Sequence, residues 1–562
     1  MLSYAPAPRD FETIGKTRNI HRSPYVGLTG APTGALPHHE ELMKKSRFAF
    51  AAAAAAAVAL ALTACAPNPN PDGGSGGSSE GSFSYVIGAD PASLNPINVG
   101  DRWGLTVTNL IYSPLARIEG DGTIRNELAD SITPSDDGLS VTVVLKEGLK
   151  WSDGEPLTAD DVVFTYKNKA VRENGNADLL WVGDKPITAE ATDERTVVFH
   201  LPSVSAAALS NIATETYIIP EHIYKNVDDF SVAELDPIAV GSGPYKLAKY
   251  ERGQYLTFEA NENYYGDAPN IPNITLQIVA NADTVKTALQ TGEADAAFAT
   301  PEQVEELEGA GLDTYTYPEG RVAYLGLNVG RLTDQKVRQA IFFALNRDDI
   351  NDAAFLSSDY YENALSILPP SNPFATDDLE TYEQDTEKSK DLLAEAGEEN
   401  LKISLAYTGS DPAQTAEATL MQEQLSQAGI TAELAALDAN ALSAETEKGA
   451  DSKYDAFLGG YIMGNDPDAY SLIFRSDASW NTFGYASKKT DALFDKGVSE
   501  LDPDKRGAIY DDLQAQIADD AVFYPIADNL KILAVNSRIG GVDDATPVPI
   551  YTLENFGLLT EK

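Results

Sequence analysis

Few residues of this chain have the types and spacing that catalysis or metal binding requires. The 562 residues include one cysteine, Cys65, and five histidines, of which only His200 and His222 follow Cys65. The sequence contains no H-E-x-x-H, C-x-x-C or phosphate-binding glycine motif. Paired carboxylates such as Asp160 and Asp161 are frequent, but neighbouring residues of a helix point in different directions. We therefore expect no cofactor, no metal site and no catalytic residue, while a surface-anchored hydrolase that uses two carboxylates stays open as an alternative.

Cys65 lies in a setting that predicts lipid attachment. A basic segment, 43–47, precedes an alanine-rich apolar run, 48–61, which is too short to span a bilayer. The sequence Leu62-Thr63-Ala64-Cys65 then has the form of a lipobox, in which the cysteine sulfur takes a diacylglyceryl group and becomes the new N-terminus. We expect a leader and lipoprotein signal peptide over residues 1–64, with translation starting at Met43. Residues 65–82 then form a lipidated, flexible tether rich in Pro, Gly and Ser.

The charge of the chain excludes some partners. The net charge is -45, from 86 acidic and 41 basic residues. Such a field repels nucleic acid and anionic lipid headgroups, so we expect no nucleic-acid partner and a membrane contact through the lipid anchor only. The length is too great for one ordinary hydrophobic core and predicts two or three lobes.

The elements that must position any site begin with residues 140–166. Alternation over 140–146 predicts a strand, and turns at Glu147-Gly148 and at 152–154 follow it. Thr158 is placed to cap a helix with Asp161 as its capping-box partner. The predicted unit is a strand, a double turn and a capped helix with one apolar face, formed by Ala159, Val162, Val163 and Tyr166.

The order of residues in this stretch also resembles a known family. LKWSDGEPLTADDVVFTY, residues 149–166, is similar to the signature block of the family 5 extracytoplasmic solute-binding proteins of ABC importers, the oligopeptide- and dipeptide-binding lipoproteins. The stretches DPASLNPIN (90–98), GSGPYKL (241–247) and DQKVRQAIFFALNR (334–347) resemble the same family. The resemblance runs from about residue 83 to the end of the chain.

This resemblance implies the fold class. It is α/β, a two-lobed periplasmic-binding-protein-like fold of type II with an extra inserted subdomain. The first lobe would comprise residues 83–125, 217–322 and 526–562, the inserted subdomain 126–216, and the second lobe 323–525. The chain would cross between the lobes near 321–323 and near 525–528, which makes a hinge that can close on a ligand.

The resemblance also implies the function. The protein would be a monomeric receptor on the extracytoplasmic face of a bacterial membrane, and not an enzyme. It would capture oligopeptides between its lobes and deliver them unchanged to the permease and ATPase subunits of an ABC importer.

Candidate ligand residues follow from the matched segments. In the first lobe they are Asn98, Asp101, Arg102 and Trp103, after the S-L-N-P turn; in the second lobe they are Asn328, Tyr461, Asp466, Trp480 and Asn481. The loop 459–468 departs from the family pattern, because Met463, or a one-residue gap, stands where peptide-binding relatives place an aspartate for the ligand's ammonium group. Two hypotheses therefore stay open: a peptide bound in another way, or another small solute such as an oligosaccharide, which the aromatic residues Trp103, Tyr461 and Trp480 would favour.

Overall fold

The structure is a computed structural model that describes residues 81–118, 124–174, 177–214, 216–231, 240–548 and 552–562. The predicted signal peptide, Cys65 and the tether as far as residue 80 lie outside the described residues. No helix among the described residues is long and apolar enough to cross a membrane.

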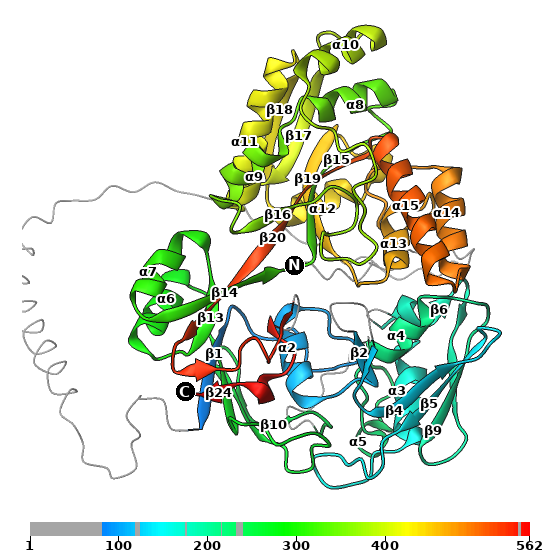
Figure 1. The fold of residues 1–562 in the computed structure, drawn as a ribbon, viewed down its shortest axis with the longest axis vertical. Coiled ribbons are helices and arrows are strands. Elements are labelled where there is room, and N and C mark those ends of the chain that lie inside the picture. The colour runs from blue at the N-terminus through cyan, green and yellow to red at the C-terminus, as the bar shows by residue number, and fades with distance from the viewer. Residues whose placement is uncertain (1–80, 119–123, 175–176, 215, 232–239, 549–551) are drawn as a thin grey trace, which may run out of the picture. The chain divides into compact units, whose positions relative to one another are not determined.

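One sheet runs through most of the described chain, and a single long strand, β20, joins its two halves (Figure 1). Residues 530–536 of β20 pair with β13 and β14, whereas residues 523–527 pair with β15. The strand order is β10-β11-β12-β1-β13-β20-β15-β19-β17-β18, and β14 and β16 also pair with β20. The bounds of the joining strands are Ala296–Ala299 for β13, Leu312–Pro318 for β14, Arg321–Leu327 for β15, Tyr361–Asn363 for β16 and Phe523–Asn536 for β20.

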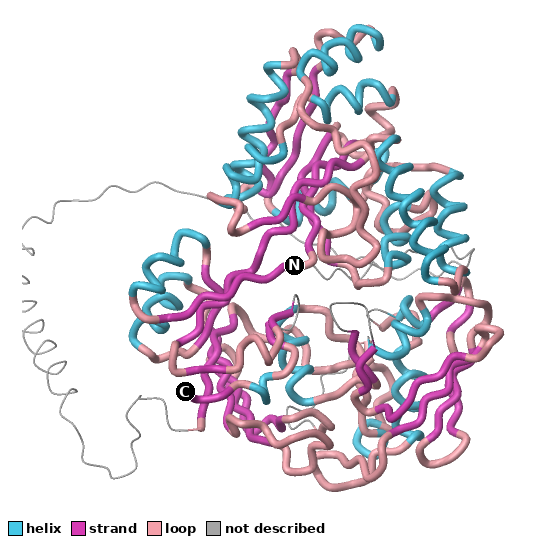
Figure 2. The backbone as a smooth tube through the Cα atoms, viewed as in Figure 1, coloured by secondary structure: helices cyan, strands magenta, loops and turns pink. Residues whose placement is uncertain are grey.

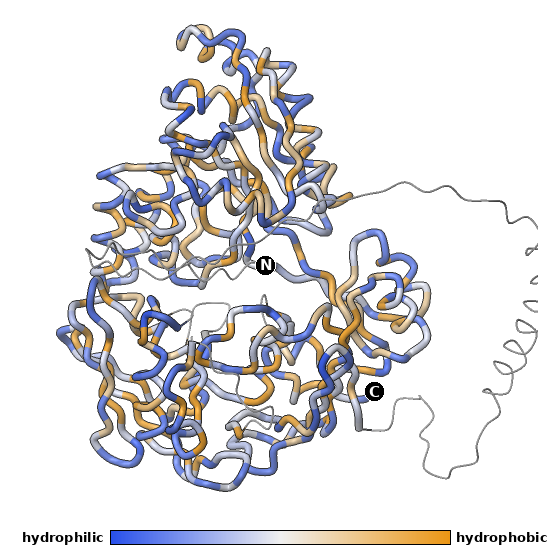
Figure 3. The backbone as a smooth tube through the Cα atoms, turned by 180° about the vertical axis from the view of Figure 1, so that it is seen from behind, coloured by the Kyte–Doolittle hydropathy of each residue, from blue (hydrophilic) through white to orange (hydrophobic). Residues whose placement is uncertain are grey.

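The first half of this sheet has a hydrophobic core on each face. Helix α2 packs on one face, where Tyr85 and Leu533 are buried, and α6 and α7 cover the other, where Val86 and Ala534 are buried. Figure 3 shows hydrophobic segments along these strands. The bounds are Ser82–Ile87 for β1, Tyr245–Glu251 for β10, Tyr255–Ala260 for β11, Asn273–Ile278 for β12, Arg102–Ile111 for α2, Ala282–Thr291 for α6 and Val304–Gly309 for α7.

Residues 115–218 build a separate core around the fully buried Trp151. Its antiparallel sheet has the order β4-β5-β9-β8, and α3 packs against it. Elements of this region are β2 (Ala116–Ile118), β3 (Ile124–Asn126), β4 (Ala129–Pro134), β5 (Ser140–Leu145), α3 (Ala159–Lys169), β6 (Trp181–Val182), β7 (Lys185–Pro186), β8 (Thr188–Ala191), β9 (Thr196–His200) and α4 (Ala208–Thr214).

The strand and helix predicted over residues 140–166 are confirmed as β5 and α3, with Thr158 as the N-cap residue. The predicted apolar face of α3 is only partly correct. Val163, which we predicted to belong to it, is only partly buried, whereas Thr165, which we did not include, is fully buried. The Asp161 carboxylate accepts hydrogen bonds from the Thr158 N–H at 2.9 Å, from Trp151 Nε1 at 3.4 Å and from the Glu221 N–H at 2.9 Å. The signature block therefore ties its own turn and helix to the returning segment at α5 (Glu221–Tyr224).

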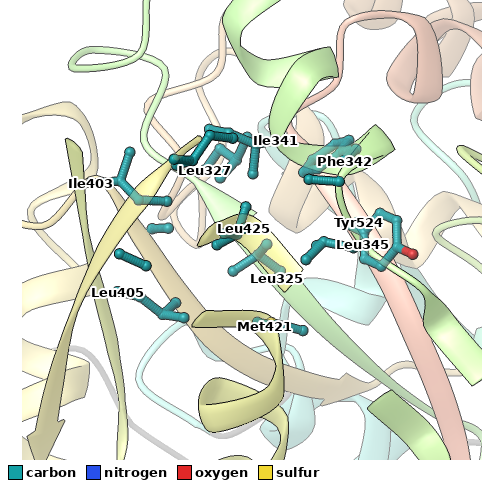
Figure 4. Packing of buried hydrophobic residues seen from close by; sticks show 14 of the residues in the cluster. Leu325, Leu327, Ile341, Phe342, Leu345, Ile403, Leu405, Met421, Leu425 and Tyr524 are labelled. Carbon is teal, nitrogen blue, oxygen red and sulfur yellow. The ribbon is translucent and has the colours of Figure 1, made fainter. Parts of the chain in front are cut away.

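The second half of the sheet carries helices on both faces (Figure 2). Figure 4 shows the core on one face, where Leu325 and Leu405 lie near Met421 and Leu425. On that face are α8 (Gln335–Phe343), α9 (Arg347–Phe355), α10 (Thr386–Ala396) and α11 (Pro412–Gln427); on the other are α12 (Ala439–Thr446), α13 (Ser471–Phe474), α14 (Lys488–Ser499) and α15 (Pro503–Asp519). The remaining strands are β17 (Lys402–Thr408), β18 (Thr431–Leu437) and β19 (Ala456–Ile462), with short C-terminal strands β21 (Ile539–Gly540), β22 (Pro547–Val548), β23 (Thr552–Leu553) and β24 (Thr560–Glu561).

Candidate functional site

The carboxyl ends of parallel strands from both halves of the sheet lie next to the strand crossing. In the first half β1, β12 and β13 run parallel, and Ala299 at the end of β13 pairs with Ile532. In the second half β17, β18 and β19 run parallel, and Ile462 at the end of β19 pairs with Arg321. Ligands of open α/β sheets bind outside the carboxyl ends of the parallel strands. The crossing, formed by residues 319–321 and 527–531, is therefore the candidate site.

A charged cluster lies at this crossing on the side of the first half. The Arg102 guanidinium forms an ion pair with Glu319 and lies 5.4 Å from the centre of the Phe298 ring. Lys531 Nζ lies 3.1 Å from Glu319 Oε1 and 5.8 Å from the same ring centre. The Glu319 side chain is 5% exposed, against 29% for Lys531. Burial lowers the pKa of the Lys531 ammonium, although Glu319 acts in the opposite direction.

Asp528 fastens the two crossing segments to each other. Its carboxylate is fully buried and accepts hydrogen bonds from the backbone N–H groups of Gly320, at 3.0 Å, and Arg321, at 3.2 Å. Gly320 has a φ of 65°, which a residue with a side chain adopts at a cost. Burial raises the pKa of Asp528 to about 7, and the two backbone hydrogen bonds oppose that increase.

Arg321 supplies a further cation on the side of the second half. Its guanidinium passes over Gly460 of β19, where a Cβ atom would lie 2.0 Å from Arg321 Nη2. Arg321 Nη1 also donates to Asn529 Oδ1 at 3.4 Å. On α11, burial raises the pKa of Glu417 to about 7, and Arg321 lowers it. Because glycine has no Cβ atom, position 460 leaves room for the Arg321 guanidinium to lie over β19.

Of the four candidate ligand residues predicted in the first lobe, one lies at the crossing and the other three make local or core contacts. Arg102 reaches the crossing, as described above. Asn98 Nδ2 donates to a backbone carbonyl at 3.0 Å, and Asp101 caps α2 by accepting a backbone hydrogen bond at 3.0 Å. The Trp103 ring is 8% exposed and packs in the core, with its centre 6.1 Å from that of Phe298. Any contact of these residues with a ligand stays a prediction.

Two predicted residues of the second lobe are asparagines that hold loops. Asn328 is 1% exposed, and its amide lies 3.2 to 3.5 Å from four backbone carbonyls of residues 449–454. The Asn481 amide donates to the carbonyls of Arg475, at 3.1 Å, and Tyr485, at 2.6 Å, and its oxygen accepts from the Tyr485 N–H at 3.0 Å. Both side chains therefore stabilise local backbone, and their predicted ligand contacts are untested.

The other three predicted residues differ in their partners. Asp466 caps the short helix Pro467–Tyr470 and forms a two-point ion pair with Arg506, at 2.7 and 2.9 Å. The Tyr461 hydroxyl donates to the Ile367 carbonyl at 2.7 Å. Trp480 is 51% exposed.

Sequence reasoning did not select Glu319, Lys531, Phe298 or Gly460. Glu319 lies just before the predicted crossing at 321–323, and Gly460 lies within the predicted loop 459–468, so these two features were the available signals. Lys531 and Phe298 lie in strands β20 and β13. The pattern of apolar and polar residues in these strands does not predict a contact between residues more than 200 positions apart.

The fold and the placement of this site define a two-lobed α/β solute-binding protein. The sequence model described as bacterial extracellular solute-binding proteins, family 5, middle part, matches residues 123–482. The chain belongs to this family of ABC-importer substrate-binding proteins, so the predicted family and fold class are confirmed.

Individual relatives match more than four fifths of the chain. The ABC transporter substrate binding protein CtaP from Listeria monocytogenes has a solved structure with a TM-score of 0.82 and 37% identity, covering 85% of this chain and 99% of that chain. A putative peptide binding protein AppA from Clostridium difficile gives a TM-score of 0.80 and 30% identity, covering 86% and 100%. The oligopeptide-binding protein AppA of Bacillus subtilis is 26% identical over 503 residues, which cover 84% of this chain and 91% of that protein.

Proposed function

We propose that this protein is a lipid-anchored, extracytoplasmic receptor that captures peptides between two hinged lobes and delivers them unchanged to an ABC permease with its ATPase subunits. It acts as a monomer, holds no cofactor and catalyses no reaction. The observation that carries the proposal is the meeting of the carboxyl strand ends of both halves at one crossing lined with charged side chains. The relatives named for peptide or oligopeptide binding support the choice of ligand class.

We propose the lobe boundaries 83–125, 217–322 and 526–562 for the first lobe, 126–216 for the inserted subdomain and 323–525 for the second lobe. The separate hydrophobic cores support this division except at its edges. There Val322, Ile526 and Ala527 pack in the cores of the second half of the sheet, and Leu115 and Ile218 pack in the core of the inserted subdomain. The two connections at residues 319–321 and 527–531 then serve as the hinge about which a ligand shifts the population toward a closed form.

An oligosaccharide ligand is the second candidate, and one observation favours it. Trp480 exposes half of its surface, and an exposed indole can stack on a sugar ring. The other two aromatic residues considered for this purpose give less support, because Trp103 is buried in the core and Tyr461 packs against Phe523 with ring centres 5.7 Å apart.

Thermal unfolding of the purified protein separates these candidates. A solute present at about 100 times its Kd stabilises the folded state by about 2.7 kcal/mol, which is measurable as an increase in Tm. We expect tetrapeptides to raise the Tm and a panel of tri- and tetrasaccharides to leave it unchanged. Stabilisation by the saccharides alone would reject the peptide proposal. Turnover of a panel compound, lost on substitution of a single carboxylate, would instead establish the hydrolase alternative.

A further inference from the structure

The Arg321 guanidinium has few partners for a group of its charge. Within the described chain it forms no ion pair, and its one hydrogen bond runs from Nη1 to Asn529 Oδ1 at 3.4 Å. Arg338 and Arg347, which form no ion pair with another described residue either, are buried and donate to backbone carbonyls at 2.7 to 3.1 Å. The Nε and Nη2 groups of Arg321 thus differ from those of the other two arginines, because no described residue supplies them with an acceptor.

The acids near Arg321 do not supply the missing anion. Both carboxylate oxygens of Asp528 accept backbone hydrogen bonds, and Glu319 is paired with Lys531. Glu417 of α11 is 3% exposed, and its carboxylate forms no ion pair or hydrogen bond with another described residue. Burial raises the pKa of Glu417 to about 7, so this acid is partly neutral at physiological pH and balances the charge of Arg321 only in part.

The guanidinium lies where a solute can reach it. The position of a Cβ atom on Gly460 is 2.0 Å from Arg321 Nη2 and 2.1 Å from Cζ, so the flat face of the guanidinium, and not its edge, lies over the glycine. Gly460 is exposed and Arg321 is partly exposed. Arg321 also pairs with Ile462 at the carboxyl end of β19, and ligands of open α/β sheets bind at such ends. The edge that carries Nε and Nη2 is therefore not blocked by β19.

We propose that Arg321 binds a carboxylate of the captured solute through Nε and Nη2, and that the buried Glu417 weakens this attraction when it is ionised. Two adjacent N–H groups of a guanidinium match the two oxygens of a carboxylate. The proposal rests on the receptor function proposed above and narrows the ligand class to solutes with a free carboxylate. In a peptide this group is the C-terminus or an acidic side chain.

Three tetrapeptide libraries test the subsite by calorimetric titration of the purified protein. The first is built from Gly, Ala, Ser and Leu with a free C-terminal carboxylate. The second has the same composition with a C-terminal amide, and the third is the amide library with Glu added. We expect the wild-type protein to bind the acid library at least tenfold more tightly than the plain amide library. Tight binding of the Glu-containing amides would identify a side-chain carboxylate as an accepted source.

Substitution of the arginine tests which residue gives this preference. Arg321→Gln should reduce the preference for acid over amide to less than threefold. Arg321→Lys keeps the charge but not the paired N–H groups, so its preference should lie between those of Arg321→Gln and the wild type. The matched control is Arg331→Gln, which removes an arginine that pairs with Asp455 at 2.6 Å on the surface and should leave the preference unchanged.

Substitution of the buried acid should act in the opposite direction. Glu417→Gln removes the negative charge near Arg321 and keeps the shape of the side chain. We expect this variant to bind the acid library at least twofold more tightly than the wild type at neutral pH and to show a larger preference for acid over amide. A purely structural role of Arg321 would not produce opposite changes in this preference. The Glu417→Gln measurement also tests the proposal if Arg321→Gln fails to fold.

The outcomes distinguish the subsite from the receptor function. Equal binding of the acid and plain amide libraries by the wild-type protein, or a preference that survives Arg321→Gln, overturns the subsite and leaves the receptor function standing. An unchanged preference in Glu417→Gln contradicts the effect proposed for that acid. Failure of every library to bind rejects the peptide receptor and the subsite together.

Discussion

The Asp528 carboxylate accepts a hydrogen bond from the Arg321 backbone N–H at 3.2 Å, across the two segments through which the chain crosses between the halves of its sheet. Arg321 begins β15, and Asp528 lies in the middle of β20. An ionised acid at this place restrains both connections at once, because its other oxygen binds the Gly320 N–H. Protonation converts one acceptor oxygen into a hydroxyl and weakens one of these hydrogen bonds, but it also removes the cost of burying the charge, which is the larger effect on the pKa of Asp528.

The raised pKa of Asp528 predicts a specific pH dependence of stability. The folded protein binds this proton more tightly than the unfolded chain, in which an aspartic acid has a pKa of about 3.9. The free energy of unfolding should therefore fall as the pH rises from about 4 to about 7, by up to about 4 kcal/mol from this group. Asp528→Asn should flatten that slope in urea unfolding measured between pH 4 and 8. If the free energy of unfolding changes with pH in the same way in the wild type and in Asp528→Asn, the pH dependence does not come from Asp528. The control is the surface substitution Asp313→Asn, which should leave the slope unchanged.

Replacement of Gly460 tests the path of Arg321 along the sheet. A Cβ atom there would lie 2.0 Å from the guanidinium, so Gly460→Ala must displace it. We expect a loss of about 1–3 kcal/mol in the free energy of unfolding, together with weaker ligand binding. The matched control is Gly507→Ala within α15, where a Cβ meets no atom within 4 Å and alanine should stabilise the helix by up to about 1 kcal/mol. Equal changes in the free energy of unfolding for Gly460→Ala and Gly507→Ala would contradict this prediction. They would show that the Arg321 side chain moves away from the new Cβ atom without a measurable cost.

The signature block is expected to serve stability and not ligand binding. Asp161→Asn replaces a buried carboxylate that accepts three hydrogen bonds, and one of those donors would then face an amide N–H group. We expect a loss of about 1–3 kcal/mol in urea unfolding with little change in peptide affinity. Asp160→Asn removes the same charge from the same helical turn at an exposed position, so it should cost much less. A large loss of affinity in a stable Asp161→Asn protein would contradict this view.

The lipid anchor is tested at Cys65. Cys65→Ser removes the thiol that accepts the lipid, so the protein should leave the membrane fraction and appear in the soluble fraction after cell fractionation. Metabolic labelling with a radioactive fatty acid should mark the wild-type protein and not the variant. A variant that loses its signal sequence and still sediments with membranes would show that another feature anchors the chain.

The sequence by itself determined the family, the α/β class and the local units that depend on neighbouring residues. The capped helix after Thr158 is an example, because a cap and an apolar face are set by residues at most a few positions apart. The sequence did not determine which candidate residues contact a ligand. An asparagine whose side chain binds the backbone of a loop, as Asn328 does, cannot be distinguished by residue type from an asparagine that binds a solute.

Only the tertiary structure decided which charges meet. Arg102 and Glu319 are 217 positions apart, and Lys531 lies on a third segment. Their contact depends on the register of β20 against β13 and β14, which long-range strand pairing sets. Burial is decided in the same way, since Trp103 lies in the core and Trp480 outside it although both are tryptophans in matched segments.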